Sequence, residues 1–267
     1  MNSNDMQHLS EDRDHIAAKL RIAVRDRALI EPVRNEISDP SDALAKSIQR
    51  ANIDFWVKEG RRIVGSKVGI TSRAAQEQFG IDSPAYGTLF ADMVETDGAS
   101  IDANVVSQLR VEAEIAFVLN SDIDNPNTTI VDVISAIDYG LPAIELVSSR
   151  IRDWDLKLFD FIADNAAASM IVLGETPFDI QSCDVRTLGT VTTINGNHRS
   201  FGSGGAYLGS PLQSLLWLAR ERVTDGNPLR RGEVVMTGAL GPIISSGKGA
   251  FIDVRIGHLP PVIVEIT

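Results

Sequence analysis

The stretch Val111-Glu-Ala-Glu-Ile-Ala-Phe-Val-Leu119 places two acidic residues inside an otherwise apolar run. Its length and its branched and aromatic residues predict a buried β-strand. Residues two apart on a strand point to the same face, so Glu112 and Glu114 share one face. Two bare carboxylates buried side by side are strongly unfavourable. Either one of them holds a proton or both of them hold a cation.

A third carboxylate lies in a second apolar run, where Glu145 interrupts Leu141-Pro-Ala-Ile-Glu-Leu-Val147. Three converging carboxylates with no histidine nearby predict a hard divalent cation, Mg²⁺ or Mn²⁺. Such a cation would act as a Lewis acid on a 2-oxo-carboxylate. The alternative is a pair of ordinary glutamates on a half-exposed strand. Apolar Ala116 and Val118 on the same face argue against it.

Outward from these runs, short β-type segments alternate with Gly- and Asp-rich turns from Ile63 onward. The expected strands are 63–64, 67–70, 111–119, 143–147, 170–173, 189–194, 234–237 and 251–256, and the expected helices between them are 72–79, 130–137 and 211–222. This order predicts an α+β fold with a mixed, curled β-sheet. We expect residues 63–267 to form the catalytic part and residues 1–62 a helical region, the two making one structural unit.

Two helices are expected in the N-terminal region. The first spans about residues 10–30, with Ser10 as N-cap. In the second, Asp39 would cap the helix and Pro40 would take its first position. Gly60 would end it.

The composition limits the kind of partner. The 267 residues are 43% hydrophobic and 23% charged, with a net charge of −11. An acidic chain is poorly suited to nucleic acid or an anionic membrane, so we expect neither as a partner. The single cysteine, Cys183, permits no intrachain disulfide. The N-terminus does not resemble a signal peptide, and no apolar run approaches the ~20 residues of a membrane span. These features predict a cytoplasmic protein.

Several basic residues could serve an anionic substrate. Lys67, in Gly65-Ser-Lys-Val-Gly-Ile-Thr71, is either a desolvated ammonium that binds a carboxylate or moves a proton, or a surface lysine. Arg150, Arg152 and Lys157 follow Glu145 closely and could add positive charge. The alternative for these three is a solvated segment with local ion pairs.

Seven motifs occur along the chain in a combination typical of one family. They are Lys-Val-Gly-Ile-Thr-Ser (67–72), Gly-Ile-Asp-Ser-Pro-Ala-Tyr-Gly (80–87), Leu-Phe-Ala-Asp-Met (89–93), Val-Glu-Ala-Glu-Ile-Ala-Phe-Val-Leu (111–119), Pro-Ala-Ile-Glu (142–145), Ser-Arg-Ile-x-Asp-Trp (149–154) and Ala-Asp-Asn-Ala (163–166). Together they resemble the 2-keto-4-pentenoate hydratase family, which has the fold of the fumarylacetoacetate hydrolase C-terminal domain. The family also includes 4-oxalocrotonate decarboxylases.

The resemblance implies that Glu112, Glu114 and Glu145 hold Mg²⁺ or Mn²⁺ and that Lys67 is an active-site residue. It makes Thr237 a candidate for binding the substrate carboxylate. It also implies a homo-oligomer that works in meta-cleavage pathways of aromatic degradation. A complex with a neighbouring enzyme of the pathway is a further expectation.

One position departs from the pattern. Hydratases of this family usually carry an aspartate, implicated in proton transfer, where this chain has Ala85. The leading hypothesis is a metal-dependent hydratase of 2-hydroxypenta-2,4-dienoate or a substituted relative. The second is a 4-oxalocrotonate decarboxylase, which Ala85 permits. The third is a non-catalytic partner subunit, against which the complete set of carboxylates argues.

Overall fold

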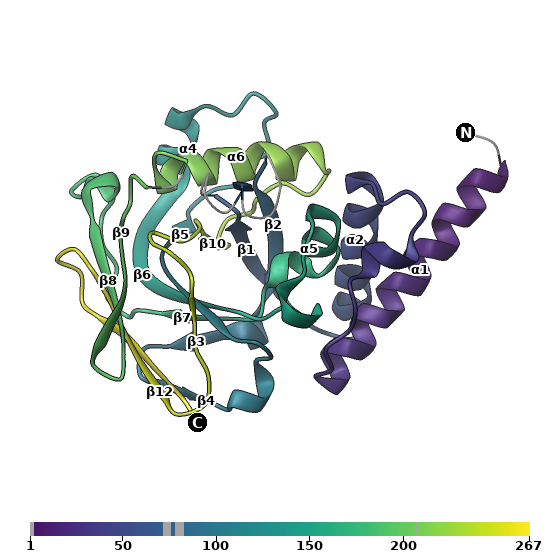
Figure 1. Ribbon diagram of the computed structural model, residues 1–267. Helices are drawn as coiled ribbons and strands as arrows, with labels where there is room; N and C mark the ends of the chain where they lie inside the picture. The colour runs from purple at the N-terminus through teal and green to yellow at the C-terminus, as the bar shows by residue number, and fades with distance from the viewer. Residues whose placement is uncertain (1–2, 72–75, 78–82, 207) are drawn as a thin grey trace.

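The computed structural model describes residues 3–71, 76–77, 83–206 and 208–267, and it joins a helical N-terminal part to two β-sheets (Figure 1). The described helices are α1 (Ser3–Asp26), α2 (Asp42–Lys58), α4 (Ile130–Ala136), α5 (Leu158–Ala163) and α6 (Pro211–Thr224). The helix expected at 72–79 lies largely outside the described residues. Among the described residues, none of the helices combines the length and apolar character that crossing a bilayer needs.

The larger sheet contains the apolar segment 111–119 with its two glutamates. Within the described residues it has eight strands, in the order β2-β1-β10-β5-β6-β7-β3, with β11 paired to β5. Their bounds are β1 Ile63–Gly69, β2 Ala85–Phe90, β3 Val94–Thr96, β5 Arg110–Leu119, β6 Ile137–Val147, β7 Met170–Leu173, β10 Val234–Met236 and β11 Ile244–Ser245. Parallel pairs (β1–β10 and β3–β7) occur beside antiparallel ones, so the sheet is mixed.

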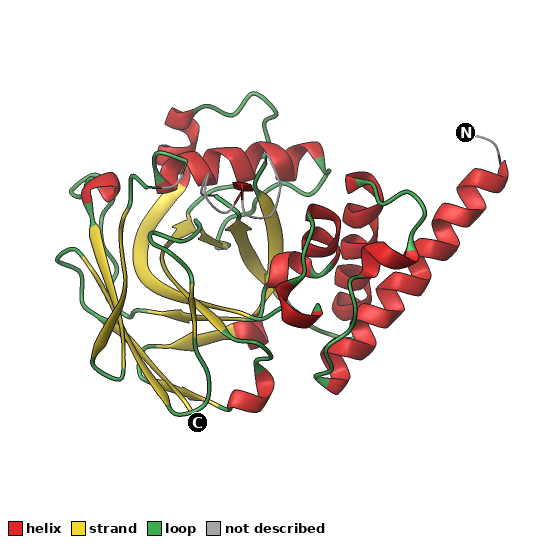
Figure 2. Cartoon of the chain, in the orientation of Figure 1, coloured by secondary structure: helices red, strands yellow, loops and turns green. Residues whose placement is uncertain are grey.

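A second sheet packs against the first, and both are drawn in yellow in Figure 2. Among the described residues it contains five strands in the order β4-β13-β12-β8-β9. These are β4 Ala99–Ile101, β8 Gly189–Ile194, β9 Asn197–Ser203, β12 Ala250–Ile256 and β13 Val262–Ile266. Alternate residues of β12 and β13 are buried, as expected for strands with one face on a core. The predicted α+β class with a mixed sheet is confirmed.

The two faces of β5 have different surroundings. Its odd-numbered residues, from Val111 to Leu119, join the hydrophobic core that also includes residues of the second sheet and of α6. Its even-numbered residues lie on the opposite face, where Ala116 packs in a separate apolar cluster. The acidic residues share that even-numbered face, so the main core stays apolar.

The N-terminal helices pack beside the catalytic part through α5 (Figure 1). Ile16 and Leu20 of α1, Ile48 of α2 and Phe159 of α5 belong to one buried cluster. Two predicted caps are wrong. Ser10 lies inside α1, and the cap of α2 is Ser41, whose hydroxyl accepts a hydrogen bond from the Leu44 amide.

Candidate active site

The pairing of β5 with β6 brings the three carboxylates together. Glu112 lies directly opposite Glu145, and Glu114 lies opposite Ala143. Paired residues on neighbouring strands point to the same face, so all three side chains project to one side of the sheet. One oxygen atom from each carboxylate lies within 4.8 Å of the others. Glu114 and Glu145 are fully buried, and Glu112 is partly exposed.

Three oxygen atoms of this cluster lack hydrogen-bond donors of good geometry among the described residues. Glu114 Oε2 accepts a hydrogen bond of 2.9 Å from the Gly238 amide. Within the described part of the chain, Glu114 Oε1 and both oxygens of Glu145 accept none of good geometry. Buried carboxylate oxygens without donors are strongly unfavourable unless a cation or a proton compensates them. The donor set therefore fits a hard divalent cation.

The raised pKa values of two of the glutamates also indicate that the cluster needs a compensating positive charge. Burial raises the pKa of Glu112 to about 7, with the charge of Glu145 adding to the rise and Lys67 opposing it. Burial, followed by the charges of Glu145 and Glu112, also raises the pKa of Glu114 well above its ordinary value. Near neutral pH the cluster therefore holds protons that a bound cation would replace.

Lys67 lies beside the carboxylates and is not a surface residue. Its side chain is 1% exposed, and Nζ lies 3.1 Å from Glu145 Oε1. The ring centroid of Phe161 lies 5.5 Å from Nζ. Burial lowers the pKa of Lys67, but the charges of Glu145, Glu112 and Glu114 outweigh that effect and the pKa is raised. Lys67 is therefore a buried ammonium, and the surface interpretation is wrong.

A cavity of about 70 Å³ opens beside Glu112 and Lys67. Its remaining wall consists of one further cation and mostly apolar side chains: Gly69, Ile70, Arg110, Val147, Trp154, Leu156, Phe161, Ala167 and Ile243. A Cβ atom at Gly69 would lie 2.8 Å from the Phe161 ring, so a larger residue here would displace that ring. The cavity thus offers a polar end formed by the carboxylates and an apolar wall, as in many small-molecule sites.

Thr237 lies one residue before the Gly238 amide that binds Glu114, and it forms no hydrogen bond with the carboxylates among the described residues. Its buried hydroxyl donates to the Ile115 carbonyl at 2.8 Å. The next residue, Gly238, supplies the amide that binds Glu114. Gly238 has φ of +94°, and a Cβ atom there would lie 2.6 Å from Thr71 Oγ1. Thr237 therefore fixes the turn that positions Gly238, and its role in substrate binding stays a prediction.

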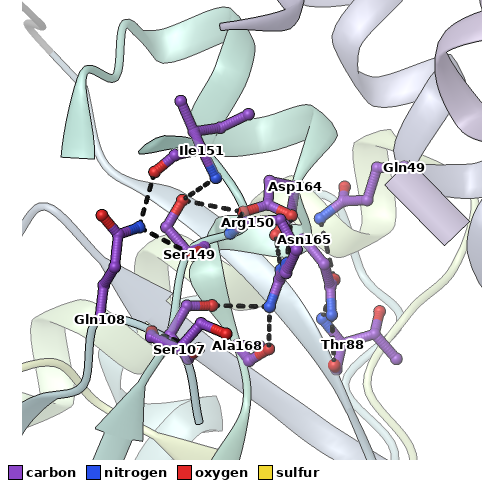
Figure 3. Close-up of polar contacts among 11 residues, drawn as sticks. Gln49, Thr88, Ser107, Gln108, Ser149, Arg150, Ile151, Asp164, Asn165 and Ala168 are labelled. Carbon is purple, nitrogen blue, oxygen red and sulfur yellow. Dashed lines mark hydrogen bonds and ion pairs between the residues drawn. The ribbon is translucent and has the colours of Figure 1, made fainter. Parts of the chain in front are cut away.

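Arg150 and Lys157 make no contact with the carboxylate cluster among the described hydrogen bonds and ion pairs, and their role in substrate binding stays a prediction. Figure 3 shows Arg150 enclosed by Asp164 and backbone carbonyls. Nε lies 2.5 Å from Asp164 Oδ1, and the terminal nitrogens donate to the carbonyls of Ser148 and Asp164 at 2.6 Å. These contacts occupy its donors, so Arg150 anchors the chain after β6. Lys157 is exposed at the start of α5.

Arg110 lines the cavity, and it was not among the site residues predicted from the sequence. It lies two residues before Glu112, on the same face of β5. Burial lowers the pKa of Arg110, and the nearby charge of Glu112 opposes that effect. The alternation that identified Glu112 and Glu114 would have identified Arg110 had it been extended by one step.

Comparison with known proteins agrees with this architecture. Residues 62–266 match the family described as fumarylacetoacetate (FAA) hydrolase C-terminal. The chain belongs to that family. The carboxylate cluster, Lys67 and the cavity all lie inside the matched region.

Two relatives in this family are named as hydratases. The chain is 45% identical over 237 residues to the TodF product hydratase of Pseudomonas putida F1, covering 89% of this chain and 88% of the relative. It is 39% identical over 255 residues to the 2-keto-4-pentenoate hydratase of Paraburkholderia xenovorans LB400, covering 96% and 95%.

A solved structure of a decarboxylase is also similar. It is 4-oxalocrotonate decarboxylase from Pseudomonas putida G7, complexed with magnesium and adipate. The two structures superpose with a TM-score of 0.93 at 30% sequence identity, over 97% of this chain and 98% of that one. The similarity includes the N-terminal helical region as well as the matched family domain.

Proposed function

We propose that this protein is a metal-dependent hydro-lyase that adds water to 2-hydroxypenta-2,4-dienoate (2-keto-4-pentenoate) or a substituted relative. The product is a 4-hydroxy-2-oxo acid of aromatic meta-cleavage catabolism. The observation that carries the proposal is the cluster of Glu112, Glu114 and Glu145 beside a cavity with an apolar wall. The names of the two hydratase relatives described above support this choice of substrate.

The three glutamates would hold Mg²⁺ or Mn²⁺. The bound cation supplies Lewis acidity toward the oxygens of a 2-oxo acid. Lys67 keeps a proton on Nζ at the inner end of the cavity, 3.1 Å from Glu145 Oε1. Its proton can be shared with a substrate oxygen as charge moves onto that oxygen. Phe161, Leu156 and Val147 face the hydrocarbon part of the substrate and limit the access of bulk water.

A spectrophotometric assay tests this proposal. Purified, Mg²⁺-loaded protein receives either 2-hydroxypenta-2,4-dienoate or 4-oxalocrotonate, and an EDTA-treated sample is the control. We expect metal-dependent loss of the dienoate absorbance with no release of CO₂. Release of CO₂ from oxalocrotonate, with the dienoate left intact, would contradict the hydratase assignment.

A 4-oxalocrotonate decarboxylase is the second candidate, and Ala85 favours it. Ala85 is buried among the residues that pack around Phe161, and a methyl group cannot transfer a proton. Loss of CO₂ needs no residue that activates water. The variant Ala85→Asp separates the two candidates further. In a hydratase we expect it to raise the rate of dienoate hydration, and an unchanged rate would exclude a role for this position.

We also propose a homo-oligomer located in the cytoplasm. Among the described residues, four large apolar side chains on α1 and α2 are exposed, with Ile22 49%, Val24 36%, Phe55 42% and Val57 43% accessible. Apolar surface of this kind often marks a contact between subunits. Sedimentation velocity of the purified protein tests this point, and a monomer at micromolar concentration would contradict it. Co-purification with a neighbouring pathway enzyme would indicate a larger complex.

A further inference from the structure

Arg110 has no acidic partner among the described residues. No carboxylate there forms an ion pair with it, and no acceptor there takes a hydrogen bond from its guanidinium; its side chain contacts the Trp154 ring. The other cation of the cavity, Lys67, is committed to Glu145 at 3.1 Å. Arg110 is therefore a charge on the cavity wall that the described protein does not neutralise by direct contact.

The contact with Trp154 orients Arg110 without using its donors. The guanidinium carbon lies 4.1 Å from the ring centroid. A guanidinium that stacks on an aromatic face keeps its N–H groups, which lie in its plane, available to an anion. Trp154 is itself fixed, because its Nε1 donates a 3.0 Å hydrogen bond to the Gln108 carbonyl. These contacts hold the guanidinium in place before any ligand arrives.

Two other partly buried arginines have a carboxylate partner. Arg150 is bound by Asp164 at 2.5 Å, and Arg34 is bound by Asp160 at 2.6 Å. Each of those residues ties two segments of the chain together through a carboxylate. Arg110 has an aromatic neighbour in place of the carboxylate, so a purely structural ion pair does not account for it.

The position of Arg110 indicates which anionic group it would receive. It is two residues from Glu112 on the same strand face, a spacing of about 7 Å along the strand. The wall beyond it is apolar, with Val147, Leu156 and Ile243. An anion held by Arg110 would lie beside the carboxylate cluster, while the hydrocarbon part of the same molecule would contact the apolar wall.

We infer that Arg110 binds the C1 carboxylate of the 2-oxo acid substrate, and this inference rests on the proposed function. The guanidinium offers two parallel N–H groups to a carboxylate, which fixes its orientation as well as its charge. Arg110 thus restricts the site to ligands with a carboxylate next to the oxygen that faces the metal ligands. A second carboxylate at the far end of the substrate is not required.

Binding of pyruvate to the Mg²⁺-loaded protein tests this inference. Pyruvate is a 2-oxo acid with one carboxylate, so it probes C1 recognition without turnover. Isothermal titration calorimetry should show affinity for pyruvate reduced about tenfold to a hundredfold in Arg110→Met, the range expected for a lost charge-assisted contact. Arg110→Lys should lose less, because it keeps the charge but not the paired donors.

The matched control is Arg199→Met, which removes the same charge from an exposed position on β9. It should bind pyruvate as the wild type does. Mg²⁺ affinity, measured without an organic ligand, should remain within about threefold in both Arg110 variants, and thermal unfolding should show that they are folded. If Arg110→Met does not fold, the pyruvate affinity of Arg110→Lys is compared with that of the wild type.

Three results would overturn the inference. They are equal pyruvate affinity in wild type and Arg110→Met, no pyruvate binding by the wild type, and weakened binding of the diacid 2-oxoadipate alone. The last result would place Arg110 at the distal carboxylate. The dienoate assay tests the proposed function independently of pyruvate binding. If pyruvate binding depends on Arg110 but the dienoate is not turned over, the hydratase assignment is refuted and the role of Arg110 remains supported.

Discussion

At the scale of single residues, the cavity wall contains unusual backbone conformations. Ile70, Trp154 and Ala167 all line the cavity and have φ between 55° and 58°. A residue other than glycine in this left-handed region costs roughly 1–2 kcal/mol, and a β-branched residue such as Ile70 adopts it rarely. Such conformations persist only where the surrounding contacts enforce them. The packing around the cavity therefore holds its wall in one geometry.

Removal of Glu114 should abolish the metal site. In Glu114→Ala we expect the affinity for Mn²⁺ to fall by about a hundredfold or more, because even outer contacts of metal ligands contribute tenfold to a hundredfold. Titration followed by electron paramagnetic resonance measures free Mn²⁺ directly. Glu175→Ala, at an exposed position, is the control. Unchanged Mn²⁺ stoichiometry in Glu114→Ala would refute the assignment of the site.

The raised pKa of Glu112 predicts how stability of the metal-free protein depends on pH. Between its ordinary value of 4.5 and about 7, folded Glu112 keeps a proton that the unfolded chain has released. The folded state then binds more protons, so stability falls as pH rises through this window. The shift corresponds to at most about 3–4 kcal/mol. We expect Tm in EDTA to fall between pH 5 and 7.5.

The variant Glu112→Gln checks the source of this slope, because glutamine does not titrate. Its Tm should depend less on pH over the same window. A wild-type Tm that stays level or rises between pH 5 and 7.5 in EDTA would contradict the prediction.

At the scale of elements, a short helical turn is hydrogen-bonded to β2, an edge strand of the larger sheet. Asn165 begins the 3₁₀ turn Asn165–Ala167 and bonds both backbone groups of Thr88 in β2. Its Oδ1 also accepts a hydrogen bond from Gln49 of α2 (Figure 3). One buried amide thus joins three elements that are far apart in the sequence. Since β2 pairs with β1, this joint also supports the strand that carries Lys67.

Asn165→Ala should destabilise the protein by about 2–4 kcal/mol. The substitution leaves the buried N–H and C=O of Thr88 without these partners, and each unsatisfied group costs about 1–3 kcal/mol. Urea unfolding gives the free energy difference. Asn127→Ala, on an exposed loop, is the matched control and should change stability by less than about 0.5 kcal/mol. A similar small change in Asn165→Ala would show that water replaces these contacts.

At the scale of the whole molecule, the site depends on both parts of the chain. Phe161, which lines the cavity, lies on α5, and α5 packs against α2. Arg34, in the segment before α2, donates to the buried carboxylate of Asp160. We propose on these contacts that residues 1–62 and 63–267 form one structural unit, so loss of the N-terminal helices would expose the cavity wall.

A divalent cation should stabilise the entire protein. A ligand that binds only the folded state adds about 2.7 kcal/mol at a concentration of 100 times its Kd. For a chain of this size that corresponds to a rise in Tm of roughly 5–10 °C. Differential scanning fluorimetry with increasing Mg²⁺ or Mn²⁺ measures the rise. It should be absent in Glu114→Ala, and an equal rise in that variant would indicate binding elsewhere.

Elements with a regular sequence pattern could be predicted without the structure. Strands β5, β7, β8 and β12 and helices α4 and α6 lie within about two residues of their predicted bounds. Gly60 follows the end of α2 as expected. The alternation along β5 was sufficient to place two glutamates on one face, because side-chain direction on a strand follows directly from residue spacing. Short strands such as β3, β4 and β11 were missed, since two or three residues carry no measurable period.

Which charged residues lie beside the carboxylate cluster depends on the tertiary structure. Lys67 was ambiguous in the sequence, and the pairing of β1 with β10, and of β10 with β5, brings it to the carboxylates. Arg150 follows Glu145 closely in the chain, yet Asp164 holds it elsewhere, and Arg110 lines the cavity in its place. Spacing along one strand fixes the direction of its own side chains. Contacts between strands and loops depend on register and on competing partners, which the local sequence does not specify.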